Sequence, residues 1–126
     1  MSILGLGTDV VEIARMQHIY AAHGERFAKR LLSEQEYPAL ASAAQPAALL
    51  ARRFAAKEAA AKALGCGIGA QASFHDLIVA HDDAGAPKLV LSGPAAIRAQ
   101  QLGVSATHLS ISDERAYAMA VVILES

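Results

Sequence analysis

The chain has 126 residues, of which 54% are hydrophobic and 18% charged, a balance that excludes a disordered tail and predicts one compact domain over residues 1–126. Its formal net charge of −1 excludes a strongly basic surface that would bind nucleic acid without specificity. A single cysteine, Cys66, excludes a disulfide within the chain and a cysteine-based zinc site, so we expect a reducing, cytoplasmic environment.

The N-terminal stretch "ILGLG" alternates aliphatic residues with glycine and predicts a short strand over residues 3–7. Gly5 and Gly7 would let another backbone or a ligand approach this strand closely. Asp9 comes soon after it, and its carboxylate either binds a metal or caps the helix that follows. Charged residues this early argue against a secretion signal, and no stretch of the chain has the length of a membrane span.

A helix is predicted next, in "VVEIARMQHIYAAHG", because Ile13, Met16 and Tyr20 recur at helical spacing and Gly24 can end it. The following "RFAKRLL" indicates a further helical turn. Residues 13–32, which we call the basic segment, carry four basic side chains against one acidic, a local charge of +3. The basic residues are Arg15, Arg26, Lys29 and Arg30. This segment either attracts an acidic partner or is an ordinary solvated surface.

Ser33 and Glu36 have the spacing of a capping box at a helix start, although Pro38 should keep that helix short or kinked. A long helix is then predicted over residues 46–64, because proline suits a first helical turn and Gly65 offers a left-handed stop. Its apolar positions at helical spacing include Leu50, Phe54, Ala61 and Leu64.

Charged residues interrupt the alanine-rich end of this helix, in "RFAAKEAAAKALGCG". Glu58 and Lys62 share one face, where a surface ion pair would contribute only about 0.3 to 0.5 kcal/mol. Lys57 points about a hundred degrees away from Glu58 around the helix. A surface pair and a functional role therefore both remain open for Glu58 and Lys62.

The C-terminal half reads as two hairpins separated by a helix. "SFHDLIVAH" and "PKLVLSG" flank the turn "DDAGA", and "THLSISDERAYAMAVVILE" alternates on both sides of "DER". Pro94 begins the intervening helix and Gly103 ends it. The predicted fold class is therefore α+β, one small domain with a long central helix packed on antiparallel strands and hairpins.

Several familiar motifs are missing. "GLGTD" lacks the third glycine of a dinucleotide-binding fingerprint, and no parallel βαβ unit follows it. The five histidines show no HExxH spacing, and no serine stands in a GxSxG turn. Ser110 and Ser112 share one face of the last hairpin and would line a cleft if one lay there.

Three separated segments nevertheless carry a resemblance: "GLGTDVVEIARM", "RRFAAKEAAAKALGCGIG" and "HLSISDERAYAMAVVI". In this order and spacing they resemble the holo-(acyl carrier protein) synthase family of bacterial 4′-phosphopantetheinyl transferases, over essentially the full length. The resemblance implies Mg²⁺-dependent transfer of the phosphopantetheine arm of coenzyme A to a serine of an apo-acyl carrier protein, in support of fatty acid biosynthesis. Adenosine 3′,5′-bisphosphate would be the second product.

The resemblance implies Asp9 and Glu58 as the two metal ligands, which agrees with the preference of Mg²⁺ for carboxylates, waters and phosphate oxygens. Lys62 would stabilise the departing phosphate, and either Glu58 or a water on the metal would accept the serine proton. Lys57 would touch another phosphate or only hold the helix surface.

The same family pattern implies coenzyme contacts at five positions. They are Arg53, Phe54, Gly65, Gly85 and Pro87, with Lys62 reaching the diphosphate. It also implies that Arg15, Arg26 and Arg30 dock the acidic carrier protein, and that the chain forms a homotrimer with sites between subunits. No nucleic acid or membrane partner is expected.

One position departs from the family. Many relatives carry histidine where this chain has Asp113, so a histidine role in contacting phosphate or transferring a proton does not carry over. We expect Asp113 to pair with a basic group. Two alternatives to the transferase are a non-catalytic trimer that binds carrier proteins and a different Mg²⁺-nucleotide enzyme.

Overall fold

A computed structural model describes all of residues 1–126. Its helices and strands follow one another as β1 Ile3–Glu12, α1 Ile13–His23, α2 Glu25–Leu31, α3 Pro38–Ala41, α4 Pro46–Ala63, β2 Leu77–His81, β3 Pro87–Leu91, α5 Gly93–Leu102, β4 Ala106–Asp113 and β5 Tyr117–Glu125. A short 3₁₀ turn, η1, covers Phe74–Asp76 before β2. Helices and antiparallel strands thus share one fold, which confirms the predicted α+β class.

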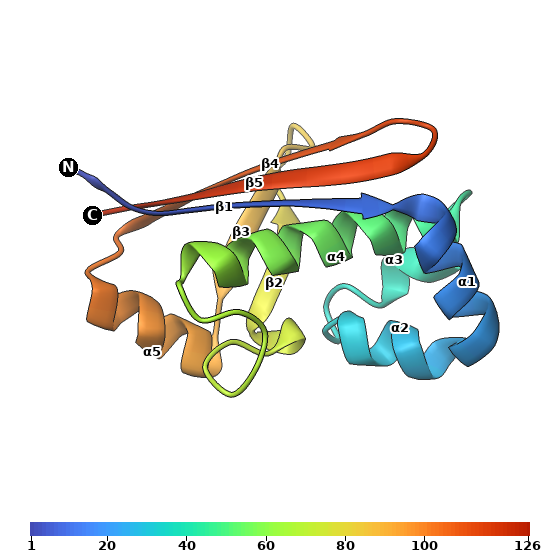
Figure 1. The fold of residues 1–126 in the computed structure, drawn as a ribbon, viewed down its shortest axis with the longest axis horizontal. Helices are drawn as coiled ribbons and strands as arrows, with labels where there is room; N and C mark the ends of the chain where they lie inside the picture. The colour runs from blue at the N-terminus through green and yellow to red at the C-terminus, as the bar shows by residue number, and fades with distance from the viewer.

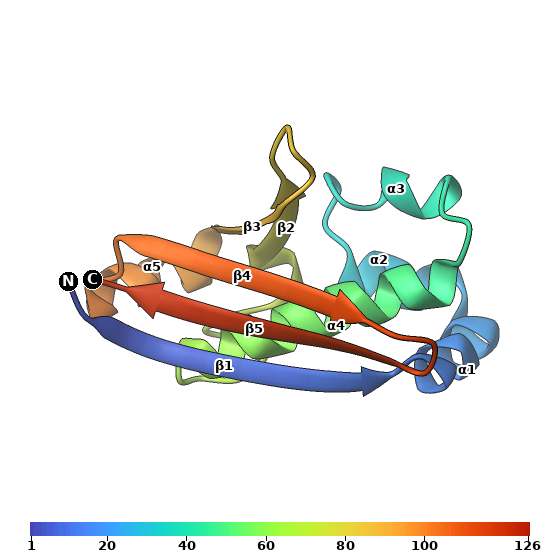
Figure 2. The ribbon, with the colours of Figure 1, turned by 90° about the horizontal axis from the view of Figure 1, so that it is seen from above.

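Three antiparallel strands form the main sheet in the order β1-β5-β4, and α4 lies across one of its faces (Figure 1). A separate hairpin of β2 and β3 stands beyond β4, on the side of the sheet opposite to β1 (Figure 2). The chain ends lie together, because the Ser126 amide donates to the Ser2 carbonyl at 2.9 Å. The main sheet therefore has β1 at one edge and β4 at the other, and the hairpin lies beyond the β4 edge.

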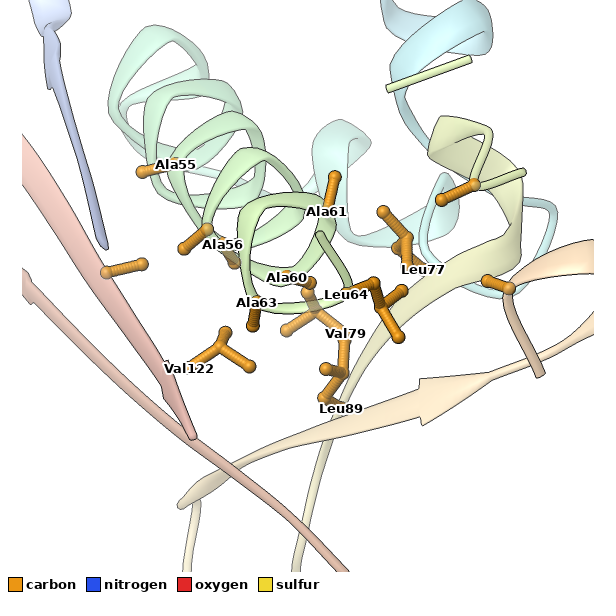
Figure 3. Close-up of a cluster of buried hydrophobic side chains, with 14 of the residues drawn as sticks. Ala55, Ala56, Ala60, Ala61, Ala63, Leu64, Leu77, Val79, Leu89 and Val122 are labelled. Carbon is orange, nitrogen blue, oxygen red and sulfur yellow. The ribbon is translucent and has the colours of Figure 1, made fainter. Parts of the chain in front are cut away.

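The core is made mainly of small side chains on α4. Its alanines contact Val122 of β5 on one side and Val79 and Leu89 of the hairpin on the other (Figure 3). Small side chains let the sheet approach the helix very closely. At Gly7 of β1, an added Cβ would lie 1.9 Å from the Ala59 carbonyl oxygen of α4. Glycine at this strand position is therefore a requirement of the packing.

The outer face of the main sheet is covered by no other element of this chain. Large apolar side chains remain exposed there, among them Leu6, Val10, Tyr117 and Met119. Ser110 and Ser112 lie on this exposed face, paired with β5. Ser112 lines a pocket there beside Asp113, but neither Asp9 nor Glu58 lines that pocket. None of the helices combines the length with the apolar character that a membrane crossing needs.

The first strand and the first helix differ from the sequence-based prediction. The strand predicted over residues 3–7 continues to Glu12, and the helix begins only at Ile13. The cause is tertiary, because β5 pairs with β1 as far as Glu12 and Tyr117. Asp9 consequently lies inside a strand and caps no helix, so the capping alternative was wrong.

The other predicted elements are largely confirmed. The long helix begins at Pro46, Gly103 caps the end of α5, and both hairpins form. The segment "SFHD" is wrong as strand, because Phe74–Asp76 forms η1. Only half of the Ser33–Glu36 capping box forms: the Ser33 amide donates to the Glu36 carboxylate at 2.9 Å, while the Ser33 hydroxyl has no partner.

Candidate functional site

Two carboxylates meet where β1 lies on α4. Asp9 lies on the inward-facing side of β1, two residues after Gly7, and Glu58 lies on α4 one residue before Ala59. Lys62, one helical turn after Glu58, donates to Asp9 Oδ1 at 3.1 Å and to the Thr8 carbonyl oxygen at 2.9 Å. We call Asp9, Glu58 and Lys62 the acidic site. Its existence depends on the close strand-to-helix contact at the β1 glycines.

The electrostatics of the acidic site favour a cation. Burial raises the pKa of the Glu58 carboxyl, and the neighbouring Asp9 carboxylate raises it further, whereas Lys62 and Arg15 lower it. Asp9 Oδ2 is buried and has no hydrogen-bond partner. Lys62 bonds to Asp9 and Thr8, so a simple surface pair between Glu58 and Lys62 does not describe this site.

A magnesium ion fits these residues. An unpartnered carboxylate oxygen beside a second carboxylate supplies the hard oxygen ligands that Mg²⁺ prefers. No group of three or more potential metal ligands occurs in the chain, so the protein supplies two carboxylates at most here. Such a set leaves room for waters and for phosphate oxygens of a substrate.

Phe54 and Arg15 extend the acidic site toward α1. Phe54 lies one helical turn before Glu58, and the Arg15 guanidinium carbon lies 5.9 Å from the centre of its ring. Arg15 is also close enough to lower the pKa of Glu58. Arg26 and Arg30 are exposed on α2, beyond α1. Of the three predicted docking arginines, Arg15 is therefore the one that borders the acidic site.

Arg53 and Lys57 face a different side of α4 from Glu58. Lys57 is completely buried, and its ammonium donates to Glu36 Oε1 at 2.6 Å and to the Phe74 carbonyl oxygen at 2.8 Å. Both expectations for Lys57 were wrong: it neither holds an exposed helix surface nor lies where a phosphate could reach it directly. Burial lowers the pKa of Arg53, which is only 8% exposed.

The hairpin turn holds two of the predicted coenzyme contacts. Gly85 has a φ of 87°, which favours glycine, and Pro87 begins β3. Asp82 Oδ1 accepts from the Ala84 and Ala86 amides, both at 2.9 Å. These backbone donors hold the pKa of the Asp82 carboxyl below its usual range. Sequence reasoning singled out this turn without identifying Asp82, although aspartate at a turn start is a recognised signal.

The acidic site and the hairpin turn lie at opposite edges of the main sheet (Figure 2). The acidic site is beside β1, and the hairpin turn is beyond β4. One chain therefore brings Asp9, Glu58, Lys62, Phe54 and Arg15 together, but it does not bring the hairpin turn to them. The predicted Gly65, with a φ of 75°, ends α4 beside the Leu64 carbonyl that accepts from Arg98 at 3.0 Å.

Asp113 lies at the end of β4 and pairs with a base of its own chain. Its Oδ2 accepts from Arg52 Nη1 at 3.3 Å, and both side chains are about one-third exposed or more. The expectation that Asp113 pairs with a basic group is confirmed. Arg52 points away from the Glu58 face of α4, so this pair lies apart from the acidic site.

Comparison with known proteins gives a consistent result. Residues 5–122 match the model of the 4′-phosphopantetheinyl transferase superfamily. A holo-[acyl-carrier-protein] synthase of Vibrio parahaemolyticus is 55% identical over 126 residues, covering 100% of both chains.

Solved structures agree with this match. The crystal structure of the corresponding synthase of Neisseria meningitidis is 37% identical with a TM-score of 0.93, covering 99% of this chain and 100% of that one. The synthase of Helicobacter pylori, solved in complex with coenzyme A, is 32% identical with a TM-score of 0.83, covering 95% of this chain and 99% of that one.

Proposed function

The chain belongs to the 4′-phosphopantetheinyl transferase superfamily, and from this premise we propose that its acidic site performs the transfer with Mg²⁺. As a holo-(acyl carrier protein) synthase, the protein is an enzyme that moves phosphopantetheine from coenzyme A to an apo-acyl carrier protein. The observation that carries the proposal is the buried Oδ2 of Asp9, which has no hydrogen-bond partner. It lies beside Glu58, whose own pKa is raised by burial and by the Asp9 carboxylate.

Asp9 and Glu58 would hold the magnesium ion. When bound, Mg²⁺ supplies positive charge that offsets the negative charge developing on the diphosphate. Lys62 adds a second cation at the same place, because its ammonium already lies 3.1 Å from Asp9 Oδ1 and its side chain is half-exposed. A diphosphate at this point would therefore meet a fixed positive group of the protein.

The reaction balances as a phosphoryl transfer. The carrier serine oxygen forms a new bond to the phosphorus that bears the pantetheine arm, and the P–O bond within the diphosphate breaks. Adenosine 3′,5′-bisphosphate leaves with the electron pair of that bond, and Lys62 would stabilise the charge on its 5′-phosphate. Glu58 would accept the serine proton as the general base.

We propose that a second chain completes the site. The hairpin turn with Gly85 and Pro87 is separated from the acidic site within one chain. Arg53 lies on the hairpin side, because its charge acts on His81 of β2. A neighbouring chain that presents its hairpin to the β1 side would join the two parts. The exposed apolar face of the main sheet supports association, because a second chain would cover it. A homotrimer with sites between adjacent chains fits both observations.

The carrier protein would approach over the basic segment. Arg26 and Arg30 are exposed, and Arg15 reaches from α1 to the acidic site, so this surface leads an acidic carrier toward Glu58. Opposite charge mainly speeds encounter. We propose fatty acid biosynthesis as the process served and, from the single cysteine, a reducing cytoplasmic location.

Mass spectrometry of an apo-acyl carrier protein tests the proposal. The wild-type enzyme with coenzyme A and Mg²⁺ should add one phosphopantetheine to the carrier serine, and chelation of divalent ions should stop the reaction. Glu58→Gln keeps the size of the side chain and should abolish turnover while far-ultraviolet circular dichroism stays unchanged. Turnover of Glu58→Gln near the wild-type rate would remove Glu58 from the proposed machinery. Transfer that continues under chelation would remove the metal.

A further inference from the structure

A buried ion pair joins four parts of the chain beside the hairpin. Lys57 and Glu36 have side chains that are 0% and 2% exposed, and their charged atoms lie 2.6 Å apart. Glu36 Oε1 also accepts from the Ser33 amide at 2.9 Å, and Oε2 accepts from the Val79 amide of β2 at 3.0 Å. Lys57 additionally donates to the Phe74 carbonyl oxygen of η1. The pair thus connects the loop before α3, helix α4, η1 and strand β2.

Its bond to Val79 adds a polar contact to a hairpin whose inner side chains Leu77, Val79 and Leu89 pack in the main core. A two-stranded hairpin is only marginally stable by itself. Within the chain, β2 pairs only with β3, so its other edge has no strand partner. The Val79 amide on that edge donates to the Glu36 carboxylate. On the other strand, the Thr107 hydroxyl donates to the Leu89 carbonyl oxygen at 3.1 Å. Besides its apolar packing, the hairpin that carries Gly85 and Pro87 therefore has one such hydrogen bond at the middle of each strand.

Arg53 lies one helical turn before Lys57 and, unlike Lys57, has no ion-pair partner. It is 8% exposed, yet its guanidinium makes no hydrogen bond or ion pair in the structure, and its nitrogens are not sealed from solvent. Burial lowers the pKa of Arg53, and the nearby Glu36 carboxylate partly offsets this effect. Burial also lowers the pKa of His81 at the end of β2, and Arg53 lowers it further. Two cations thus compete for the Glu36 carboxylate, and Lys57 occupies it.

We propose that Lys57 is a positioning residue for coenzyme binding: by occupying Glu36, it leaves the Arg53 guanidinium free to bind a phosphate of coenzyme A. The inference rests on the proposed function, because it takes the hairpin side as part of the coenzyme site. Loss of Lys57 would let Arg53 turn to Glu36, since a buried carboxylate without a counter-ion strongly attracts the nearest cation. Arg53 would then be unavailable to the ligand.

The comparison of a single with a double variant tests this competition. Lys57→Met removes the buried cation and keeps its length, so we expect the Kd of coenzyme A, measured by titration calorimetry, to rise about tenfold. In Glu36→Gln/Lys57→Met no charge remains for Arg53 to pair with. We expect this double variant to recover a Kd within about threefold of the wild type. The KM for coenzyme A should follow the same order, while kcat and the KM for the carrier change little.

Stability is controlled separately. Met16→Ala removes a completely buried side chain of α1, beside β1 and at the edge of the main sheet opposite to the hairpin, so it destabilises the protein and should leave the Kd of coenzyme A unchanged. Thermal unfolding of each variant shows that binding is measured on folded protein. The proposal would be overturned if Glu36→Gln/Lys57→Met bound coenzyme A as weakly as Lys57→Met. It would also be overturned if Lys57→Met lost kcat at constant KM.

Two further outcomes keep the test decisive. If Lys57→Met does not fold, Glu36→Gln replaces it: the proposal requires coenzyme binding close to that of the wild type, because Arg53 is already free. A tenfold or greater loss in Glu36→Gln would mean that Glu36 orients Arg53 directly, against the proposal. Absence of coenzyme binding by the wild type would instead refute the proposed function itself.

Discussion

Replacement of Gly7 by alanine should separate the two elements that form the acidic site. The new Cβ would lie 1.9 Å from the Ala59 carbonyl oxygen and 2.8 Å from the Ala63 amide nitrogen, while ordinary contact begins at 3.4 Å. Both neighbours are backbone atoms of a helix, which no side-chain rotation can remove. Strand β1 and helix α4 must therefore move apart by about 1.5 Å at this point.

The expected cost follows from this displacement. Overpacking of a well-packed core costs about 1 to 3 kcal/mol, and we expect the upper end because backbone is involved. For a chain of this size, such a loss lowers the Tm by about 10 °C. The same movement lengthens the 3.1 Å bond between Lys62 and Asp9. A misplacement of about 1 Å can reduce turnover about a hundredfold.

Thermal unfolding and steady-state kinetics check both effects. Turnover is measured well below the lowered Tm, so that the activity loss reports geometry and not unfolding. Gly69→Ala is the matched control, because a Cβ there meets no atom within 4 Å and the φ of Gly69 is not positive. An unchanged Tm with turnover within about threefold of the wild type would refute the packing argument.

Asp113→Ala should lower turnover about tenfold or less, a barrier change of about 1.4 kcal/mol, because its ion pair with Arg52 is partly exposed. A loss as severe as that of Glu58→Gln would make Asp113 a direct participant. Asp82→Ala should raise the KM for coenzyme A with kcat nearly unchanged, since two turn amides lose their acceptor. Because the pKa of the Asp82 carboxyl is depressed, the carboxylate stabilises the turn fully above the ordinary pKa of 3.8. This stabilisation disappears as the pH falls through the lowered pKa. Amide exchange rates of the hairpin, measured against pH, would show the loss. The transfer rate to the carrier should fall as salt rises, because exposed charges are screened beyond about 8 Å at physiological ionic strength, and Arg26→Glu/Arg30→Glu should flatten that dependence. A wild-type rate independent of salt would exclude electrostatic steering.

Local signals predicted most of the helices and both hairpins, because proline and glycine mark their ends. Pro46 and Gly103 are examples, one at a helix start and one in the left-handed conformation at a helix end. The length of β1 could not be read in this way. "VVEIARM" has helical spacing, and only pairing with a strand more than a hundred residues later keeps Val10 and Val11 extended. Such pairing is invisible to a local pattern.

The candidate site shows the same division. Family resemblance placed Asp9, Glu58 and Lys62, and the structure brings these three together. Spacing alone gave Lys57 the wrong surroundings, because helical geometry tells which direction a side chain points but not what lies there. Its partner Glu36 was noticed only for its distance from Ser33, and its bonds to Lys57 and Val79 depend on tertiary packing.

The pairing of β1 with β5 has a consequence for synthesis of the protein on the ribosome. Residues 3–12 emerge more than a hundred residues before their only strand partner, residues 117–125. Contacts of such large sequence separation form slowly, because a long loop must close before they contribute. Until then β1 is an unpaired edge, and Asp9 has no fixed place against α4. A nascent or C-terminally truncated chain should therefore lack divalent-ion affinity even where α4 is already helical, and it should need protection from aggregation during this interval.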